Sequence, residues 1–126
     1  MDYRTKQLRA ISPCDHNVRG HLVVLDYDNG RGVDHVIAVV RSHRGNMIVM
    51  DSEASFVPNN TTLYNSVDLQ QRGNNMCGYY SIAFISFYNH HYQSLDDRQI
   101  IDLFTSSLVG RSIEEIKNIL TRYINY

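Results

Sequence analysis

The first half of the chain consists of short apolar runs separated by turn-forming residues. Residues 21–26, 34–41 and 47–51 are rich in Val, Ile, Leu and Met, and residues 28–32 and 42–46 between them contain Gly, Asn, Asp and Ser. Such a pattern predicts three β-strands, the second and third joined by a hairpin connection. Because the runs are nearly continuous, we expect a sheet that is covered on both faces or buried at the centre of the core.

The segments around these strands carry weaker patterns. Residues 3–11 predict a short helix that is broken at Ser12-Pro13. Residues 52–65 are typical of a loop. Val67 and Leu69 alternate with polar neighbours and predict a short fourth strand.

In the second half the pattern changes to that of helices. A segment that starts at Cys77 has almost no polar face, so we expect a buried helix there. A second helix is expected to begin at an N-cap within residues 94–97 and to end at Gly110. A third begins at the capping box formed by Ser112 and Glu115. The positions expected to face the core in these two helices are Ile100, Ile101, Leu103, Phe104, Leu108, Ile113, Ile116, Leu120 and Ile124.

Strands followed by helices favour an α+β domain, because the two kinds of element are segregated along the chain. We expect a small mixed or antiparallel sheet packed on a buried central helix, with the C-terminal helices flanking it. The chain has 126 residues, of which 43% are hydrophobic, so residues 1–126 are expected to form a single domain with its own core.

Charge and hydropathy narrow the class of protein. The net charge of −1 demands no nucleic-acid or anionic-membrane partner. We see no apolar run long enough to cross a bilayer and no signal peptide, so the chain is expected to be neither membrane-bound nor secreted. Two cysteines, Cys14 and Cys77, do not form a disulfide framework, and a reducing compartment is expected, although the sequence leaves a bridge between them open.

Cys77 lies where a polar, glycine-containing loop meets the apolar helix. A thiol at a helix N-terminus is favoured as the thiolate, because the free backbone N–H groups and the helix dipole stabilise negative charge. A lone cysteine in apolar surroundings is nevertheless more often an inert core residue. Cys77 is therefore a candidate nucleophile only if a base lies beside it.

His35 and Asp51 are the candidate partners of Cys77. Their separation of 16 positions fits a strand, a tight turn and a returning strand, which would bring both to the same edge of the sheet. His35 would then act as general base, Asp51 would orient its ring, and Cys77 would attack a carbonyl carbon. The backbone N–H of Cys77 and a side-chain amide from Gln70 or Gln71 would stabilise the oxyanion.

The order His35, Asp51, Gln71, Cys77 resembles that of a clan of cysteine proteases. The clan includes the adenovirus maturation protease (adenain) and the SUMO-specific Ulp1/SENP proteases. Their signature is His, then Asp or Glu about seventeen residues on, and Gln six or seven residues before a Cys-Gly pair. Here Cys77 is followed by Gly78, and Gln71 precedes it by 6 positions.

The resemblance extends over roughly residues 21–90, and residues 25–35 are similar to the strand-loop-strand before the adenain histidine. There are two departures. Val36 stands where these families usually carry Trp, and the chain has no Trp. Gln70, at a spacing of 7, competes with Gln71 for the oxyanion role.

The resemblance implies an adenain/Ulp1-like fold and a cysteine endopeptidase with catalytic His35, Asp51, Cys77 and Gln71. The implied substrate is a viral polyprotein or capsid precursor, in the host-cell cytoplasm or nucleus or in the virion. The alternatives are an isopeptidase acting on ubiquitin-like conjugates, an acyltransferase using the same residues, and a non-catalytic interaction module on the same fold. An activating peptide or nucleic acid is a further partner that the resemblance allows, and Cys14 would accept a disulfide-linked activator.

No cofactor or metal is expected. Cys14-Asp15-His16 and His90-His91 contain metal-ligating residue types, but neither cluster has a full ligand set. The second pair is better explained as the exposed end of the central helix.

Overall fold

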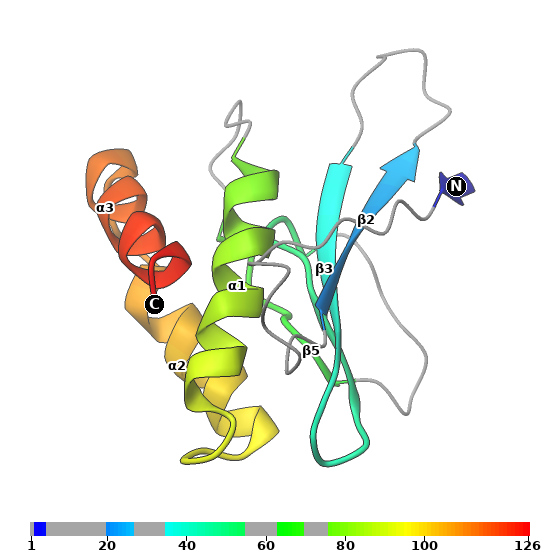
Figure 1. The fold of residues 1–126 in the computed structure, drawn as a ribbon. Helices are drawn as coiled ribbons and strands as arrows, with labels where there is room; N and C mark the ends of the chain where they lie inside the picture. The colour runs from blue at the N-terminus through cyan, green and yellow to red at the C-terminus, as the bar shows by residue number, and fades with distance from the viewer. Residues whose placement is uncertain (1, 5–19, 27–34, 55–62, 70–75) are drawn as a thin grey trace.

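The computed structural model describes residues 2–4, 20–26, 35–54, 63–69 and 76–126, with only the backbone described at 2–4 and 24–26. Strands precede helices along the chain, so the expected α+β architecture is confirmed (Figure 1). The elements in chain order are β1 (Asp2–Arg4), β2 (Gly20–Asp26), β3 (His35–Arg41), β4 (Met47–Met50), β5 (Leu63–Tyr64), α1 (Cys77–His91), α2 (Asp97–Leu108) and α3 (Ile113–Ile124).

The strands form one mixed sheet in the order β1-β2-β3-β4-β5. The first four are antiparallel to their neighbours, and β5 runs parallel to β4. The turn between β3 and β4 is closed by the hydroxyl of Ser42, which accepts hydrogen bonds from the N–H groups of Arg44 and Asn46. Gly45 in this turn has φ +85°, a conformation that glycine adopts without steric cost.

Helix α1 lies at the centre of the molecule (Figure 1). It packs on β2 and β3 on one side and on α2 and α3 on the other. Tyr80, Phe84, Phe87 and Tyr88 along it are at most 1% exposed. A helix enclosed on both sides needs apolar residues all around, which explains its sequence and confirms the predicted buried helix.

Strand β2 approaches α1 very closely at Gly20. A Cβ atom built on Gly20 would lie 2.6 Å from both Cγ1 and Cγ2 of Ile85. Packed carbon atoms essentially never come within 3.0 Å, so a larger residue here would force the Ile85 side chain or the helix that carries it to shift.

The sheet is apolar on both faces. Along β3, Ala38 and Val40 belong to the main core with the helices, whereas Ile37 belongs to a second buried cluster with Val23 and Val49. This alternation follows from the pleat of the strand. The expected burial of both faces is therefore confirmed for β2, β3 and β4.

Both C-terminal helices begin as the sequence predicts. Asp96 and Gln99 form a capping box at α2, and Ser112 and Glu115 form the predicted one at α3. Gly110, with φ +74°, lies in the turn between the two helices. None of the described helices is long and apolar enough to span a membrane.

Four details of the expected pattern are wrong. Leu103 and Ile113 are 43% and 40% exposed rather than buried, because each lies at the outer edge of its helix's apolar stripe. Asp2–Arg4 is a strand paired with β2, which contradicts the start of the predicted helix over 3–11; its remainder lies outside the described residues.

The fourth error concerns the last strand. It lies at Leu63–Tyr64, inside the predicted loop, and not at Val67–Leu69. The side chain of Asn65 explains the difference. Its amide donates to the carbonyl of Val67 and its oxygen accepts from the Val67 N–H, so these backbone groups bond within a turn instead of a strand ladder.

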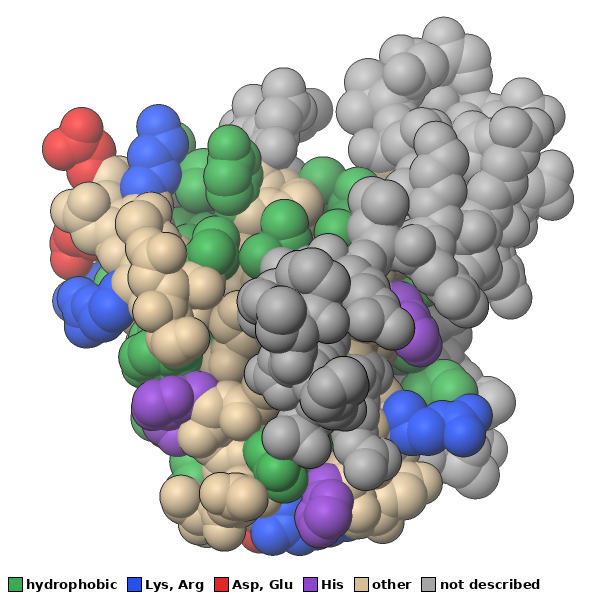
Figure 2. Space-filling model, viewed as in Figure 1, with side chains coloured by type: hydrophobic (Ala, Val, Ile, Leu, Met, Phe, Trp, Pro, Cys, Tyr) green, Lys and Arg blue, Asp and Glu red, His purple; other side chains and the backbone are tan. Residues whose placement is uncertain are grey.

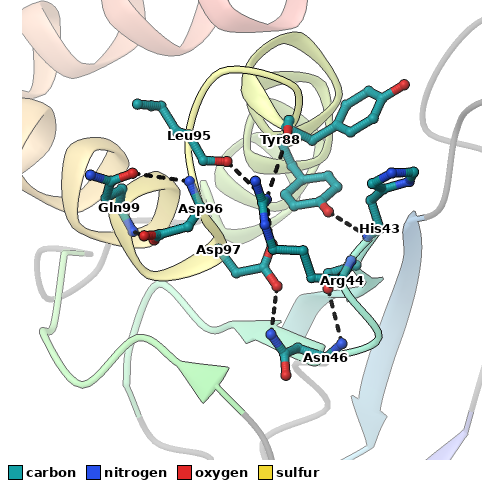
Figure 3. Close-up of polar contacts among 10 residues, drawn as sticks. His43, Arg44, Asn46, Tyr88, Leu95, Asp96, Asp97 and Gln99 are labelled. Atoms are coloured by element: carbon teal, nitrogen blue, oxygen red, sulfur yellow. Dashed lines mark hydrogen bonds and ion pairs between the residues drawn. The ribbon is translucent and has the colours of Figure 1, made fainter.

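The tip of the β3–β4 hairpin is hydrogen-bonded to residues near the C-terminal end of α1 and at the start of α2 (Figure 3). The N–H of His43 donates to the Tyr88 hydroxyl at 2.7 Å, and Nδ2 of Asn46 donates to Oδ2 of Asp97 at 2.6 Å. The guanidinium of Arg44 donates to the carbonyl of Leu95, between α1 and α2, at 2.9 Å. These bonds fix the hairpin, and with it β3, relative to α1.

Candidate active site

His35 and Asp51 meet at one end of the β3–β4 pair. β3 begins at His35, and Asp51 directly follows β4, which is antiparallel to β3. Nε2 of His35 lies 2.5 Å from Oδ1 of Asp51, shorter than the roughly 2.7–2.9 Å usual for a charge-assisted bond. Their side chains are only 5% and 2% exposed. The prediction that the hairpin makes these two residues neighbours is confirmed.

Cys77 is brought to the same place by α1. It is the first residue of the helix, is half-buried, and is a free thiol. Its sulfur is hydrogen-bonded to the ring of His35 and to the backbone N–H groups of Val36 and Gly78. No side chain in the described residues caps this end of α1, and its first turn carries no acidic residue, so its N-terminal dipole is left to act on the thiol.

The ring of His35 therefore bridges a carboxylate and a thiol. Because Nε2 is bonded to Asp51, we infer that Nδ1 faces Cys77. Ser81, one turn after Cys77, lies close to the backbone on both sides of this contact. Its hydroxyl oxygen lies 2.8 Å from the carbonyl of Cys77 and 3.2 Å from that of Val36, and so links the start of α1 to β3.

The charges in the site favour an ion pair. Burial, the largest single effect, would lower the pKa of His35. The hydrogen bonds to Asp51 and Cys77 and the negative charges of Asp51 and Glu53 together outweigh it, and the pKa of His35 is raised from 6.5 to about 10.

Burial would raise the pKa of the Cys77 thiol, but the hydrogen bonds from His35 and from the N–H groups of Val36 and Gly78, together with the positive charge of His35, outweigh it, and the pKa is lowered. Both shifts favour the same state, in which the proton resides on the imidazole and the sulfur is a thiolate.

Further hydrogen bonds hold Asp51 in place. Its Oδ1 also accepts the N–H of Glu53 at 3.0 Å, and its backbone carbonyl accepts from Nδ2 of Asn65 at 2.9 Å. Asn65 is 3% exposed and follows β5. A buried carboxylate needs hydrogen-bond partners, and for Asp51, at 1% exposure, Oδ1 has them in His35 and the Glu53 N–H, while the Asn65 bond fixes its backbone.

Leu69 is hydrogen-bonded to the turn after Asp51 and to α1. Its N–H donates to the carbonyl of Ser52 at 2.7 Å, and its own carbonyl accepts from the hydroxyl of Tyr80 at 3.1 Å. Tyr80 lies in the first turn of α1. The residue directly before the Gln70-Gln71 pair is thus attached both to the turn after Asp51 and to the helix of Cys77.

The predicted oxyanion residues Gln70 and Gln71 lie outside the described residues, as does Cys14. Of the predicted site residues, the structure brings together His35, Asp51 and Cys77.

The sequence analysis missed two side chains near the reacting atoms, Glu53 and Ser81. Both could have been found from spacing. The β3–β4 register pairs Ala38 with Met50, and continuing it three steps sets position 53 opposite His35. Ser81 lies four residues after Cys77, which places it on the same side of the helix.

Two other features involve none of the triad side chains. His90 stacks on Tyr126, with ring centroids 4.0 Å apart, and in the described part of the chain no three His, Cys, Asp or Glu side chains gather as a metal site would need. A pocket of about 440 Å³ lies between α1 and α3. Figure 2 shows hydrophobic side chains gathered over this region. The pocket is lined by Met76, Tyr79, Lys117, Leu120, Thr121 and Ile124.

In comparisons with known proteins, no family model matches the chain, and neither a curated protein nor a solved structure shows significant similarity to it.

Proposed function

We propose that this protein is a cysteine endopeptidase in which Cys77, His35 and Asp51 form the catalytic triad. The observation that carries the proposal is the position of the His35 ring, bonded to a buried carboxylate on one side and to a helix-N-terminal thiol on the other. Nucleophilic cysteine catalysis requires this arrangement of nucleophile, base and orienting group. An interaction module on the same fold would have no need of a charged imidazole buried against a thiolate.

In the acylation step, the Cys77 thiolate attacks the carbonyl carbon of a peptide bond. A C–S bond forms, and the carbonyl oxygen becomes an oxyanion. When this intermediate collapses, the C–N bond breaks and the leaving amine takes the proton from His35. Asp51 keeps the ring oriented and stabilises its positive charge until that transfer.

In the deacylation step, water attacks the thioester and gives a proton to His35. The C–S bond breaks, the carboxylic acid product leaves, and the thiolate–imidazolium pair is restored. The oxyanion of both steps would be stabilised by the backbone N–H of Cys77 at the uncapped start of α1 and by the side-chain amide of Gln71, with Gln70 as the alternative.

The substrate we propose is a protein chain, as in the adenain-like and Ulp1-like proteases that the motif order resembles. A viral polyprotein or capsid precursor is favoured over a ubiquitin-like conjugate. Both are cleaved at an acyl group by the same chemistry, so they differ in recognition and not in the triad.

The test is incubation of the purified protein with two panels, candidate precursor fragments and ubiquitin-like fusions, with Cys77→Ala as the control. We expect cleavage in the precursor panel that disappears in Cys77→Ala. Cleavage confined to the fusions would replace the proposed substrate by the second class. Absence of Cys77-dependent cleavage in both panels, with Cys77 no more reactive than an ordinary thiol, would refute the enzyme assignment.

A further inference from the structure

A second carboxylate reaches the ring of His35. Oε2 of Glu53 lies 3.7 Å from Nδ1, whereas Asp51 holds Nε2. The Glu53 side chain is 44% exposed, compared with 2% for Asp51. In the part of the chain that the structure describes, His35 is the one charged partner of this carboxylate.

The turn after β4 builds this contact. The N–H of Glu53 donates to Oδ1 of Asp51, and the N–H of Ala54 donates to the Asp51 carbonyl, both at 3.0 Å. Ala54 has φ +51°, in the left-handed region that is unfavourable for a residue with a Cβ. Such strain persists only where the surrounding contacts enforce it, and the two bonds to Asp51 hold the backbone of this turn, from which Glu53 reaches the ring.

We propose that Glu53 is a positioning residue of the catalytic site, whose carboxylate pairs with the protonated ring of His35 and retains the proton there to higher pH than Asp51 alone would. The inference rests on the proposed function, because the proton in question is the one passed to the leaving amine. Among the described residues, the titratable groups that act on His35 are Asp51 and Glu53 after β4 and Cys77 on α1.

Because Glu53 is exposed, the Glu53–His35 ion pair should depend on salt concentration, whereas the buried Asp51–His35 contact should not. Salt screens charges that are open to solvent and has little effect on buried ones. Rising ionic strength should therefore weaken the hold of Glu53 on the proton and leave that of Asp51 intact.

The experiment is an NMR titration of the His35 ring in the wild-type protein, Glu53→Gln and Glu114→Gln. The last is a matched control, since Glu114 is exposed in the first turn of α3. The chain has six histidines, and the His35 signal is identified by its loss in His35→Gln. We expect a wild-type midpoint near pH 10. Glu53→Gln should lower it by about 0.2–0.7 pH unit, as for an ion pair with one exposed partner, and Glu114→Gln should leave it unchanged.

A wild-type midpoint near 10 that does not fall in Glu53→Gln overturns the role of Glu53 and leaves the proposed function standing. A wild-type midpoint near 6.5 overturns the ion pair on which the proposed function depends. If Glu53→Gln does not fold, the wild-type protein decides. Its midpoint must fall when salt is raised from about 0.01 to 1 M, and a midpoint insensitive to salt refutes the proposal.

Discussion

Asp51 and Asp97 are both almost completely buried, with 1% and 2% of their surface exposed, and each accepts a short hydrogen bond from the β3–β4 hairpin. Oδ1 of Asp51 lies 2.5 Å from Nε2 of His35 at one end of the hairpin. Oδ2 of Asp97 lies 2.6 Å from Nδ2 of Asn46 at the other end (Figure 3). By burial and distance the two carboxylates are alike.

The two carboxylates differ in whether their partner can exchange a proton and in what that partner contacts. The imidazole that Asp51 holds can accept and release a proton, and its other side faces the Cys77 thiol. Asp97 is bonded to an amide and lies 3.7 Å from Arg44, whose guanidinium does not release a proton in proteins. A buried carboxylate is thus not by itself a sign of chemistry. A titratable partner with a nucleophile behind it is what distinguishes the Asp51 end.

The largest difference should appear when the same substitution is made at both ends. Asp51→Asn cannot stabilise the imidazolium, so we expect cleavage by Cys77 to fall about 10²–10⁴-fold. Asp97→Asn keeps an acceptor for Asn46 and should change kcat/KM less than about twofold. Steady-state kinetics of the two variants measure this. Equal losses in both would show that burial, and not the imidazole, decides the effect.

The second difference concerns pH. The thiolate–imidazolium pair exists between the lowered pKa of Cys77 and the pKa of His35 of about 10. Activity should therefore rise at a pH below the usual thiol value of about 8.5 and fall as the pH passes about 10. A profile of kcat/KM against pH measures both limits. An acid limit at or above 8.5 would contradict the ion pair.

The same shift predicts a dependence of stability on pH. The folded-state pKa of His35 is raised, so its contribution to stability is fully present below about pH 6.5 and is lost as the pH rises through about 10. Urea unfolding across this range should show the loss in the wild-type protein, and His35→Gln should remove that component. The Asp97 end should contribute nothing to it, because Arg44 keeps its charge throughout.

The third difference concerns stability, which should depend on the hydrogen bond at the Asp97 end and not on the chemistry at Cys77. Asn46→Ala leaves the buried Asp97 carboxylate without its 2.6 Å hydrogen bond, so we expect the free energy of unfolding to fall by about 1.5–3 kcal/mol. The reactivity of Cys77 should stay unchanged. Urea unfolding and thiol alkylation of the folded variant test the two halves of this prediction. A variant that is as stable as the wild type would show that the hairpin is not fastened by this bond.

The smallest effect is expected at Ser81. Ser81→Ala removes the hydroxyl between α1 and β3 and should lower the free energy of unfolding by about 1 kcal/mol. It should slow cleavage less than tenfold, because the His35 contact remains. Ser106→Ala on the exposed side of α2 is the control. A loss comparable to that of Asp51→Asn would mean that Ser81 takes part in the chemistry.

The sequence predicted those features that depend on local pattern. The hairpin between His35 and Asp51, the buried helix from Cys77 and the capping box at Ser112 follow from hydrophobic periodicity and turn residues, which act over a few positions. The proximity of His35 and Asp51 could be predicted because a tight turn fixes the register of the two antiparallel strands that it joins.

Features set by contacts distant in sequence could not be predicted. β5 forms by parallel pairing with β4, and Val67 is kept out of the sheet by the Asn65 side chain. The exposure of Leu103 depends on where α2 ends its contact with the core. For Glu53, the hairpin register sets its position opposite His35. The positive φ at the neighbouring Ala54, a conformation that alanine does not signal, could not be predicted.

The charge state of Cys77 is the central claim, and its alkylation rate tests it most directly. Cys14→Ser leaves Cys77 as the one thiol of the chain, and iodoacetamide is then applied at pH 6.5 with and without His35→Ala. An ordinary thiol is only about 1% ionised at that pH, so the ion pair predicts alkylation at least about tenfold faster with His35 than without it. Equal rates in the two proteins, both matching an ordinary thiol, would contradict the account.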